Sequence, residues 1–169
     1  MHTIVLGLGN PILGDDGIGC RVVQEVETRV NGWASPNIEI EPFYRGGIAL
    51  MERLVGYEKV VIVDSVQGLG GAPGMLLRLT LDQLPTSNYI DSPHDVSFKT
   101  ALEMGRRLGA ELPAEIVIFG VEIAPTSDFL EELSVEVAGS VEPAVLAVLD
   151  EITGSAKNST SEFPSPSEG

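Results

Sequence analysis

The chain has 169 residues, of which 43% are hydrophobic and 21% are charged, so it is long enough to bury one ordinary core. Its 25 acidic and 10 basic residues give a formal net charge of −15, which argues against binding to nucleic acid or to an anionic membrane. No apolar run approaches the roughly 20 residues of a membrane span, and no leader pattern precedes the first strand. We therefore expect a cytoplasmic protein with one domain over residues 1–153 and a disordered Ser/Pro/Glu-rich tail over residues 154–169.

The first unit in the chain is a strand, a glycine-rich loop and a helix. Residues 3–6 are almost continuously apolar, as in a strand buried on both faces, and valines recur at helical spacing over residues 22–30. The loop between them lacks the third glycine of a dinucleotide fingerprint and the Lys of a P-loop. It carries Asp15 and Asp16 instead, and two adjacent carboxylates favour a cation over phosphate. One aspartate could simply cap the helix, but a pair exceeds what a cap requires.

Cys20 is the only cysteine, and it falls beside the apolar stripe of this first helix. A single cysteine excludes an intramolecular disulfide and a zinc site built from thiolates. We interpret Cys20 as a buried, inert thiol, with a catalytic thiol as the alternative.

A glycine pair marks the second junction between a strand and a helix. Residues 38–43 alternate between apolar and polar side chains, which predicts a half-exposed strand at an edge of the sheet. Gly46 and Gly47 follow, ahead of a short helix with Leu50 facing inward. The pair either forms a tight turn or exposes backbone groups to a bound peptide.

The most apolar strand of the chain covers residues 59–64 and is expected at the centre of the sheet. Asp64 closes this strand in our interpretation. In a parallel sheet its carboxylate would lie at the same edge as Asp16, where ligands collect beyond the carboxyl ends of strands. The alternative role for Asp64 is to cap the following turn at Ser65.

The second half of the chain contains a predicted antiparallel strand, a histidine and the last helix. A short glycine-rich link precedes the strand over residues 75–80, which indicates an antiparallel member of the sheet. A polar loop then reaches His94, which we expect to start a helix and to reach the site edge with its ring nitrogens. After a buried strand over residues 115–121, Ser134 is expected to cap a last helix that Pro143 bends or divides.

Asp16, Asp64 and His94 come from three separate loops at the expected carboxyl edge of the sheet. Two carboxylates and an imidazole, with further coordination positions open, suit a borderline divalent ion such as nickel or zinc. The sequence shows neither a serine or cysteine nucleophile with a histidine and a third orienting group, nor a His-Glu-x-x-His motif. These residues therefore favour a metal site over nucleophilic catalysis.

The chain resembles the hydrogenase maturation proteases, which trim the carboxyl-terminal extension from the large subunit of nickel-iron hydrogenases. The likeness rests on the Gly-Asp-Asp-Gly-Ile-Gly segment at residues 14–19, the end of the strand at Asp64, the Ser-Pro-His segment at residues 92–94 and the terminal helix, and it extends over nearly all of residues 1–153. It implies an α/β fold with three α/β/α layers. The sheet would be mixed, mostly parallel and five-stranded, with helices on both faces.

By the same resemblance, the metal-contacting residues of the family fall on Asp16, Asp64 and His94, with the two aspartates as the catalytic acids. Nickel would be supplied by the partner, the hydrogenase large-subunit precursor, and zinc or cadmium could occupy the same site. The Gly-Gly-Thr segment of the family reads Gly-Gly-Ile here, so Gly46 and Gly47 are retained for substrate binding while the hydroxyl is absent.

Two other functions fit parts of the sequence. Residues 7–11 also open the peptidyl-tRNA hydrolases, but the Thr-Arg-His-Asn segment of those enzymes is absent and the acidic charge suits tRNA badly. A non-cleaving nickel-binding checkpoint or carrier for hydrogenase assembly would use the same three ligands. We therefore predict a metal-dependent, aspartic-type endopeptidase, with the checkpoint protein as the alternative.

Overall fold

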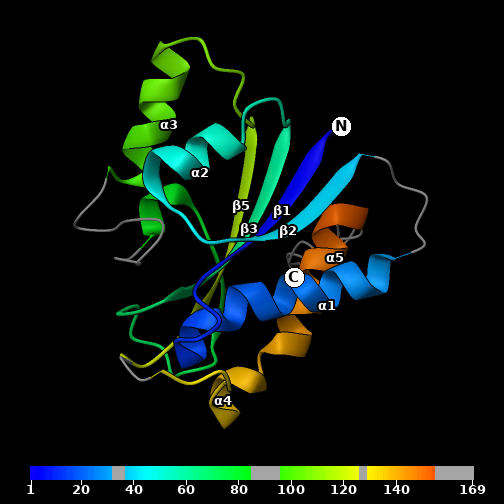
Figure 1. The fold of residues 1–169 in the computed structure, drawn as a ribbon, viewed down its shortest axis with the longest axis vertical. Coiled ribbons are helices and arrows are strands. Elements are labelled where there is room, and N and C mark those ends of the chain that lie inside the picture. Colours follow the sequence, from blue (N-terminus) through cyan, green and yellow to red (C-terminus); the bar gives the residue numbers. More distant parts are fainter. Residues whose placement is uncertain (32–36, 85–95, 126–128, 155–169) are drawn as a thin grey trace, which may run out of the picture.

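The computed structural model describes residues 1–31, 37–84, 96–125 and 129–154 and has three layers, with a sheet between two groups of helices (Figure 1). Within these residues the sheet has five strands in the order β2-β1-β3-β5-β4. The strands are β1 (Thr3–Leu8), β2 (Ile38–Phe43), β3 (Lys59–Val66), β4 (Leu76–Leu79) and β5 (Glu115–Glu122). Only β4 runs antiparallel to its neighbour, which confirms the mixed, mostly parallel sheet.

Helices cover both faces of this sheet. The helices are α1 (Ile18–Val30), α2 (Gly47–Arg53), α3 (Phe98–Arg107), α4 (Val135–Ala138) and α5 (Val141–Thr153), with the 3-10 turns η1 (Gly14–Gly17) and η2 (Leu81–Gln83). α1 and α5 pack on one face, and α2 and α3 pack on the other. In the part of the chain that the structure describes, no helix combines the length and the hydropathy needed to cross a bilayer.

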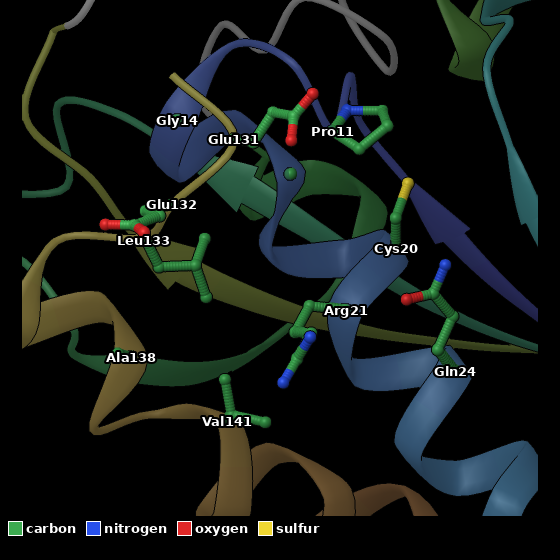
Figure 2. A pocket seen from close by; sticks show the side chains of 11 residues that line it. Pro11, Gly14, Cys20, Arg21, Gln24, Glu131, Glu132, Leu133, Ala138 and Val141 are labelled. Carbon is green, nitrogen blue, oxygen red and sulfur yellow. The ribbon is translucent and has the colours of Figure 1, made fainter.

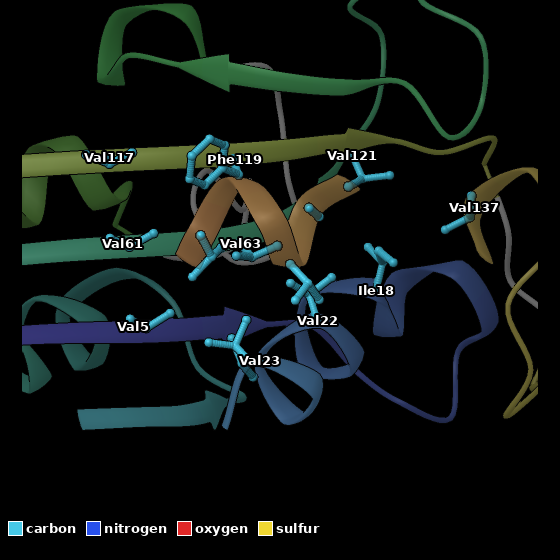
Figure 3. Packing of buried hydrophobic residues seen from close by; sticks show 14 of the residues in the cluster. Val5, Ile18, Val22, Val23, Val61, Val63, Val117, Phe119, Val121 and Val137 are labelled. Atoms are coloured by element: carbon cyan, nitrogen blue, oxygen red, sulfur yellow. The ribbon is translucent and has the colours of Figure 1, made fainter. Parts of the chain in front are cut away.

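The inner strands contribute alternate side chains to two separate cores. Val61 and Val63 of β3 pack with α1 and α5 in the first core (Figure 3), whereas Val60 and Ile62 pack with α2 and α3 in the second. A strand that is buried on both faces needs apolar residues at successive positions. This requirement explains the continuous apolar runs of β1 and β3.

α1 packs closely against β1 because two glycines face each other. A Cβ at Gly7 would overlap the carbonyl oxygen of Gly19, and a Cβ at Gly19 would overlap the carbonyl oxygens of Leu8 and Val63. Without these side chains, the first turn of α1 lies directly over the carboxyl ends of β1 and β3. The same approach brings η1, which immediately precedes α1, next to the end of β3.

The chain changes its direction of travel across the sheet between β1 and β3. From β1 it passes through α1 to β2 on one side, and from there through α2 to β3 on the other side. In open α/β sheets, ligands bind at such a switch point, in the crevice outside the carboxyl ends of the strands. The loop after β1 and the end of β3 therefore flank the position where a binding site is expected.

Two boundaries in the middle of the chain differ from the sequence prediction. β3 continues to Val66, so Asp64 lies inside the strand rather than closing it. α3 begins at Phe98 and is capped by the hydroxyl of Ser97, so the expected helix start at His94 is wrong. The cap decides this boundary, since a Ser side chain satisfies a free N–H of the first helical turn.

The last helix is divided, and the division precedes Pro143. Ser134 caps only the short α4, where its hydroxyl accepts the N–H of Val137 at 3.4 Å. Pro143 lies in the first turn of α5, where a residue without an N–H costs no helical hydrogen bond. Except for Gly154, the expected tail lies outside the described residues.

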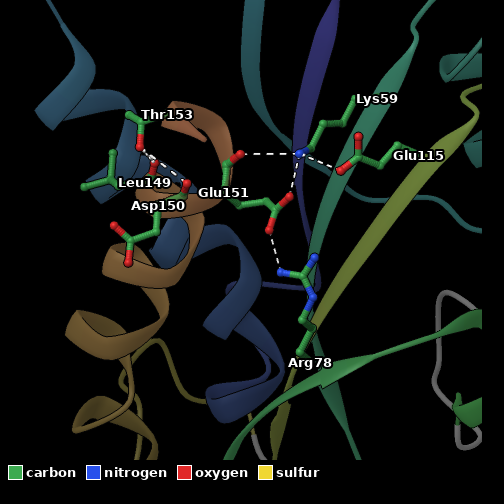
Figure 4. A network of polar contacts seen from close by, with 7 residues as sticks. All are labelled: Lys59, Arg78, Glu115, Leu149, Asp150, Glu151 and Thr153. Carbon is green, nitrogen blue, oxygen red and sulfur yellow. Dashed lines mark hydrogen bonds and ion pairs between the residues drawn. The ribbon is translucent and has the colours of Figure 1, made fainter. Parts of the chain in front are cut away.

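A network of ion pairs around the buried side chains of Lys59 and Glu151 joins α5 to the amino ends of β3 and β5 (Figure 4). The ammonium of Lys59, a side chain only 2% exposed, lies 2.5 Å from Glu151 and 2.9 Å from Glu115, and Arg78 lies 2.5 Å from the second oxygen of Glu151. Burial alone would lower the pKa of Lys59, but the carboxylates of Glu151 and Glu115 hold it above its ordinary value. Burial would likewise raise the pKa of Glu151, but Arg78 and Lys59 hold it below its ordinary value.

Candidate functional site

Asp16 and Asp64 meet at Ser65, beyond the carboxyl end of β1 and near the carboxyl end of β3. Oδ1 of Asp16 accepts a hydrogen bond from the Ser65 hydroxyl at 3.0 Å, and Oδ1 of Asp64 accepts one from the Ser65 N–H at 2.8 Å. Asp16 is 4% exposed and Asp64 is fully buried. Ser65 thus contacts both acids near the switch point of the sheet, through a local bond to Asp64 and a long-range bond to Asp16, and their role as one site stays a prediction.

Asp16 is positioned by a turn and not by capping of α1. The N-cap of α1 is Gly17, which makes no side-chain cap bond. Oδ2 of Asp16 instead accepts the N–H of Asn10 at 3.0 Å, in the loop that follows β1. The capping alternative is therefore wrong for Asp16, whose two carboxylate oxygens are directed to Asn10 and Ser65.

Asp15 has a different, structural role. Its two carboxylate oxygens accept hydrogen bonds from the N–H and the hydroxyl of Ser134, at 2.6 and 2.8 Å. Because Ser134 is the cap of α4, this contact ties η1 to the start of that helix. The two adjacent aspartates thus face different partners, and only Asp16 is directed to Ser65.

Gly46 and Gly47 form the turn that leads from β2 into α2. Gly46 has an extended backbone, and its carbonyl oxygen accepts the N–H of Leu50 at 3.3 Å. Gly47 has a φ of 54°, a conformation that favours glycine. These angles agree with the turn interpretation, and the role of the pair in binding a peptide stays a prediction.

His94, the third predicted metal ligand, lies outside the described residues. Among residues 1–31, 37–84, 96–125 and 129–154, no group of three or more His, Cys, Asp or Glu side chains could hold a metal ion. Asp16 and Asp64 are two hard oxygen donors, and a borderline metal would take an imidazole or substrate ligands beside them. The three-residue metal site therefore stays a prediction.

Cys20 lies close to both acids but is poorly suited to be a nucleophile. Its thiol is buried and lies 3.6 Å from the carbonyl oxygens of both Gly7 and Gly9. Burial raises the pKa of Cys20, and together with the nearby charges of Asp16 and Asp64 brings it to about 11. The thiolate is the reactive form of cysteine, so Cys20 is inert at neutral pH, in agreement with the sequence interpretation.

A pocket of about 520 Å³ opens beside η1 (Figure 2). Gly14 and Gly17 of η1 form part of its wall, together with Arg21 of α1 and residues 131–133, which precede α4. The lining combines charged and apolar side chains, as sites that bind peptides or small molecules commonly do. Asp16 lies between these two glycines in the sequence but does not line the pocket, because its carboxylate is buried against Asn10 and Ser65.

Two polar residues at this edge of the sheet escaped sequence reasoning. The sequence indicates Ser65 only as the position that Asp64 would cap, although its hydroxyl is the group that reaches Asp16. Glu122, at the end of β5, accepts the N–H groups of Gly68 and Leu69 at 3.0 and 3.2 Å and so holds the loop that follows β3. Both residues carried the same signal, a polar residue at the carboxyl end of an otherwise apolar strand.

Comparison with known proteins gives one consistent family. The family model for hydrogenase maturation proteases (HycI) matches residues 45–151. The hydrogenase 2 maturation protease of Escherichia coli K12 is 30% identical over 152 residues, which cover 88% of this chain and 89% of that protein. A putative hydrogenase maturation protease of Methanocaldococcus jannaschii is 29% identical over 154 residues, which cover 88% of this chain and 95% of that protein.

Solved structures agree with these sequence matches. The hydrogenase maturating endopeptidase HybD from E. coli superposes with a TM-score of 0.74 at 25% identity, covering 92% of this chain and 94% of that one. The hydrogenase 2 maturation peptidase from Thaumarchaeota archaeon SCGC_AB-539-E09 gives a TM-score of 0.62 at 29% identity, covering 90% of this chain and 99% of that one.

Proposed function

Because the chain belongs to the hydrogenase maturation protease family, we propose that it is an endopeptidase that removes the carboxyl-terminal extension of a nickel-iron hydrogenase large-subunit precursor. The observation that carries this proposal is the contact of Asp16 and Asp64 with the same residue, Ser65, at the switch point of the sheet. The family assignment gives no support to the peptidyl-tRNA hydrolase alternative. A protein substrate also suits a chain whose formal net charge is −15 better than a nucleic acid does.

In this proposal, Asp16, Asp64 and His94 contact nickel that has already been inserted into the precursor. The metal arrives as part of the substrate, so a precursor without nickel leaves the site incomplete. Bound there, nickel would polarise the scissile carbonyl or acidify a water molecule, either of which lowers the barrier by several kcal/mol. Zinc or cadmium could take the same three ligands when offered without the precursor.

The two carboxylates would carry the proton transfer. A water oxygen forms a bond to the scissile carbonyl carbon, and a proton of that water passes to Asp16 or Asp64. The same carboxyl group then gives the proton to the leaving nitrogen as the C–N bond breaks. Both aspartates are almost fully buried, and the low local dielectric strengthens their interaction with a positive ion.

Cleavage of the precursor tests the proposal directly. The purified protein is mixed with the large-subunit precursor, either loaded with nickel or kept nickel-free by a chelator, and loss of the extension is followed by mass spectrometry. We expect only the loaded precursor to be cut. Asp16→Asn and Asp64→Asn should slow cleavage by about 10²-fold or more, because each removes a group that accepts a proton.

The neighbouring acid provides a matched control for these variants. Asp15→Asn keeps an oxygen that accepts the N–H of Ser134, so this variant should cut at close to the parent rate. Equal cleavage of the nickel-free precursor would contradict gating by nickel. Binding of the loaded precursor without any cleavage would instead favour the non-cleaving checkpoint.

Metal titration of variants tests whether His94 is a metal ligand. Calorimetry with nickel, zinc or cadmium should show one site, which His94→Ala weakens by about tenfold or more because a directly bound ligand is lost. His2→Ala removes the only other histidine and should leave the affinity unchanged. Equal metal affinity in the His94 variant and the parent would show that His94 is not a metal ligand.

A further inference from the structure

The outer edge of β4 carries backbone groups that the described part of the sheet does not pair. β4 is the outermost strand beyond β5 (Figure 3), and within the described residues it pairs only with β5. A backbone N–H at the end of β5 donates to the carbonyl oxygen of Met75 at 2.9 Å. Bonded positions recur at every second residue of an antiparallel pair, so β4 bonds to β5 through Leu77 and Leu79. The N–H and C=O groups of Leu76 and Arg78 therefore point to the free edge.

An apolar hollow of about 520 Å³ lies beside this strand. Met75, Leu77 and Leu79, at alternate positions along the chain, line it together with Leu69, Gln83 and two glycines. Leu77 and Leu79 pack with the core of α2 and α3, which places the hollow on that face of the sheet.

The single charged residue of β4 does not block the hollow. Charged side chains often protect an edge strand from pairing with another chain. Arg78, however, lies 2.5 Å from Glu151 of α5 and over the ring of Phe119, so its guanidinium is held on the face that α1 and α5 cover. The free edge therefore offers backbone groups beside an uncharged hollow.

The hollow lies on the same face of the sheet as the side chain of Asp64. Ile62 and Val66 flank Asp64 at alternate positions of β3 and pack in the core with α2 and α3. Because side chains alternate between the two faces of a strand, Asp64 faces the same side as Leu77. Gly120 of β5 lies opposite both Asp64 and Leu77, so the Cα atoms of these two residues are two strand spacings, or about 10 Å, apart. A strand added outside β4 would lie about 14 Å from Asp64, a distance that roughly five extended residues span.

We propose that β4 is a substrate-binding strand, on whose free edge an extended segment of the cleaved polypeptide pairs and places an apolar side chain in the hollow; this inference rests on the proposed function. The outward backbone groups repeat at the spacing of a strand, and alternate side chains of the same strand line the hollow. Both features lie within a few residues of Asp64. Peptides that add a strand to a sheet edge are recognised in this way, with affinity from backbone bonds and specificity from pockets for alternate side chains.

The small size of this surface argues against a second copy of the chain as the occupant. Seven residues line the hollow, and β4 has four. A stable protein–protein interface uses roughly 20–30 residues of each partner. An edge of this size instead suits a short segment that is also held at the cleavage site.

Amide hydrogen exchange, read at residue resolution by mass spectrometry, tests the pairing. Asp16→Asn protein is mixed with the nickel-loaded precursor, because slow cleavage keeps the precursor intact during the measurement. In the free protein, the N–H groups of Leu76 and Arg78 should exchange faster than those of Leu77 and Leu79, which bond to β5. The precursor should slow exchange at Leu76 and Arg78 by about tenfold or more and change Leu77 and Leu79 less.

Steady-state cleavage tests the hollow. Leu69→Glu/Met75→Glu alters hollow residues that are 37% and 46% exposed, and Val55→Glu/Leu146→Glu is a matched control at residues that are 47% and 49% exposed. We expect the hollow variant to raise KM for the nickel-loaded precursor by about tenfold or more, since an apolar anchor is lost, and the control to match the parent. Leu69→Ser/Met75→Ser and thermal melting of every variant separate loss of contact from loss of fold.

Each outcome has a distinct meaning. If the parent cuts the precursor, unchanged exchange at Leu76 and Arg78 or equal KM values for the hollow and control variants would overturn the binding strand and leave the proposed function standing. A parent that cuts no precursor would refute the proposed function and this inference with it. A parent that is dimeric by light scattering, with Leu76 and Arg78 protected before any precursor is added, would assign the edge to a second copy.

Discussion

The hydroxyl of Ser65 donates a hydrogen bond to Asp16 at 3.0 Å, across the boundary between β3 and the loop that follows β1. The N–H of Ser65 donates to its neighbour Asp64 at 2.8 Å. One residue thus contacts both acids, through its side chain and through its backbone. A shift of β3 relative to η1 would change the separation of the two carboxylates, so this contact sets the geometry in which they could share a substrate.

Removal of the Ser65 hydroxyl is expected to impair the site more than the fold. Ser65→Ala deletes a hydrogen bond to a buried carboxylate, which should lower the free energy of unfolding by about 1–3 kcal/mol. Asp16 would be less well oriented, so cleavage should slow by about tenfold and the affinity for nickel should fall. Denaturant titration, calorimetry and the precursor assay measure these three effects.

Ser140→Ala is the matched control for that variant. Ser140 is also buried, and its hydroxyl donates to the carbonyl oxygen of Val137 at 2.6 Å, a contact that involves neither acid. Its loss should cost a similar stability while metal affinity and cleavage stay unchanged. Equal losses of activity in the two variants would show that Ser65 affects cleavage only through the stability of the fold.

Cys20 is expected to be dispensable for cleavage. With its pKa at about 11, the thiol should react with iodoacetamide at pH 7.5 at least about 10²-fold more slowly than a free cysteine, because the thiolate is scarce. Cys20→Ala should cut the precursor within about threefold of the parent rate. Fast alkylation at neutral pH, accompanied by loss of cleavage, would restore the catalytic thiol as an alternative.

The ion pairs at the opposite end of the sheet should respond differently to single and double substitution. Lys59→Met leaves Glu151 buried with one charge partner fewer and should lower the free energy of unfolding by about 3–5 kcal/mol. Lys59→Met/Glu151→Leu removes both buried charges and should recover most of that loss. Urea denaturation of the three proteins gives the comparison, and a double variant no more stable than Lys59→Met would contradict this expectation.

The same network should make the free energy of unfolding depend on pH. The pKa of Glu151 is lowered in the folded protein, so its contribution is complete above its unfolded value of about 4.3 and is lost as the pH falls through the folded value. Glu151→Gln does not titrate. The difference in unfolding free energy between the parent and this variant should therefore be constant from pH 6 to 8 and should shrink below about pH 4. A difference that grows on acidification would contradict the lowered pKa.

The class of fold follows from the sequence because it depends on local patterns. The apolar runs of β1 and β3 have no alternating polar residues, so neither strand can have a solvent-exposed face. Each face of these strands must therefore be covered by helices. Short links between helices and apolar strands then favour parallel pairing, and parallel strands end at one common edge. For this reason Asp16 and Asp64 could be assigned to the same edge from their positions after such strands.

The partners of individual side chains were decided only by the tertiary structure. Asp15 bonds to Ser134, 119 residues away, and Lys59 to Glu151, 92 residues away. Such pairs depend on the order of strands in the sheet and on the rotation of each helix, neither of which has a local sequence period. The different partners of Asp15 and Asp16 were likewise decided by the tertiary structure. The backbone turn of η1 directs these adjacent carboxylates to Ser134 and to Ser65, respectively.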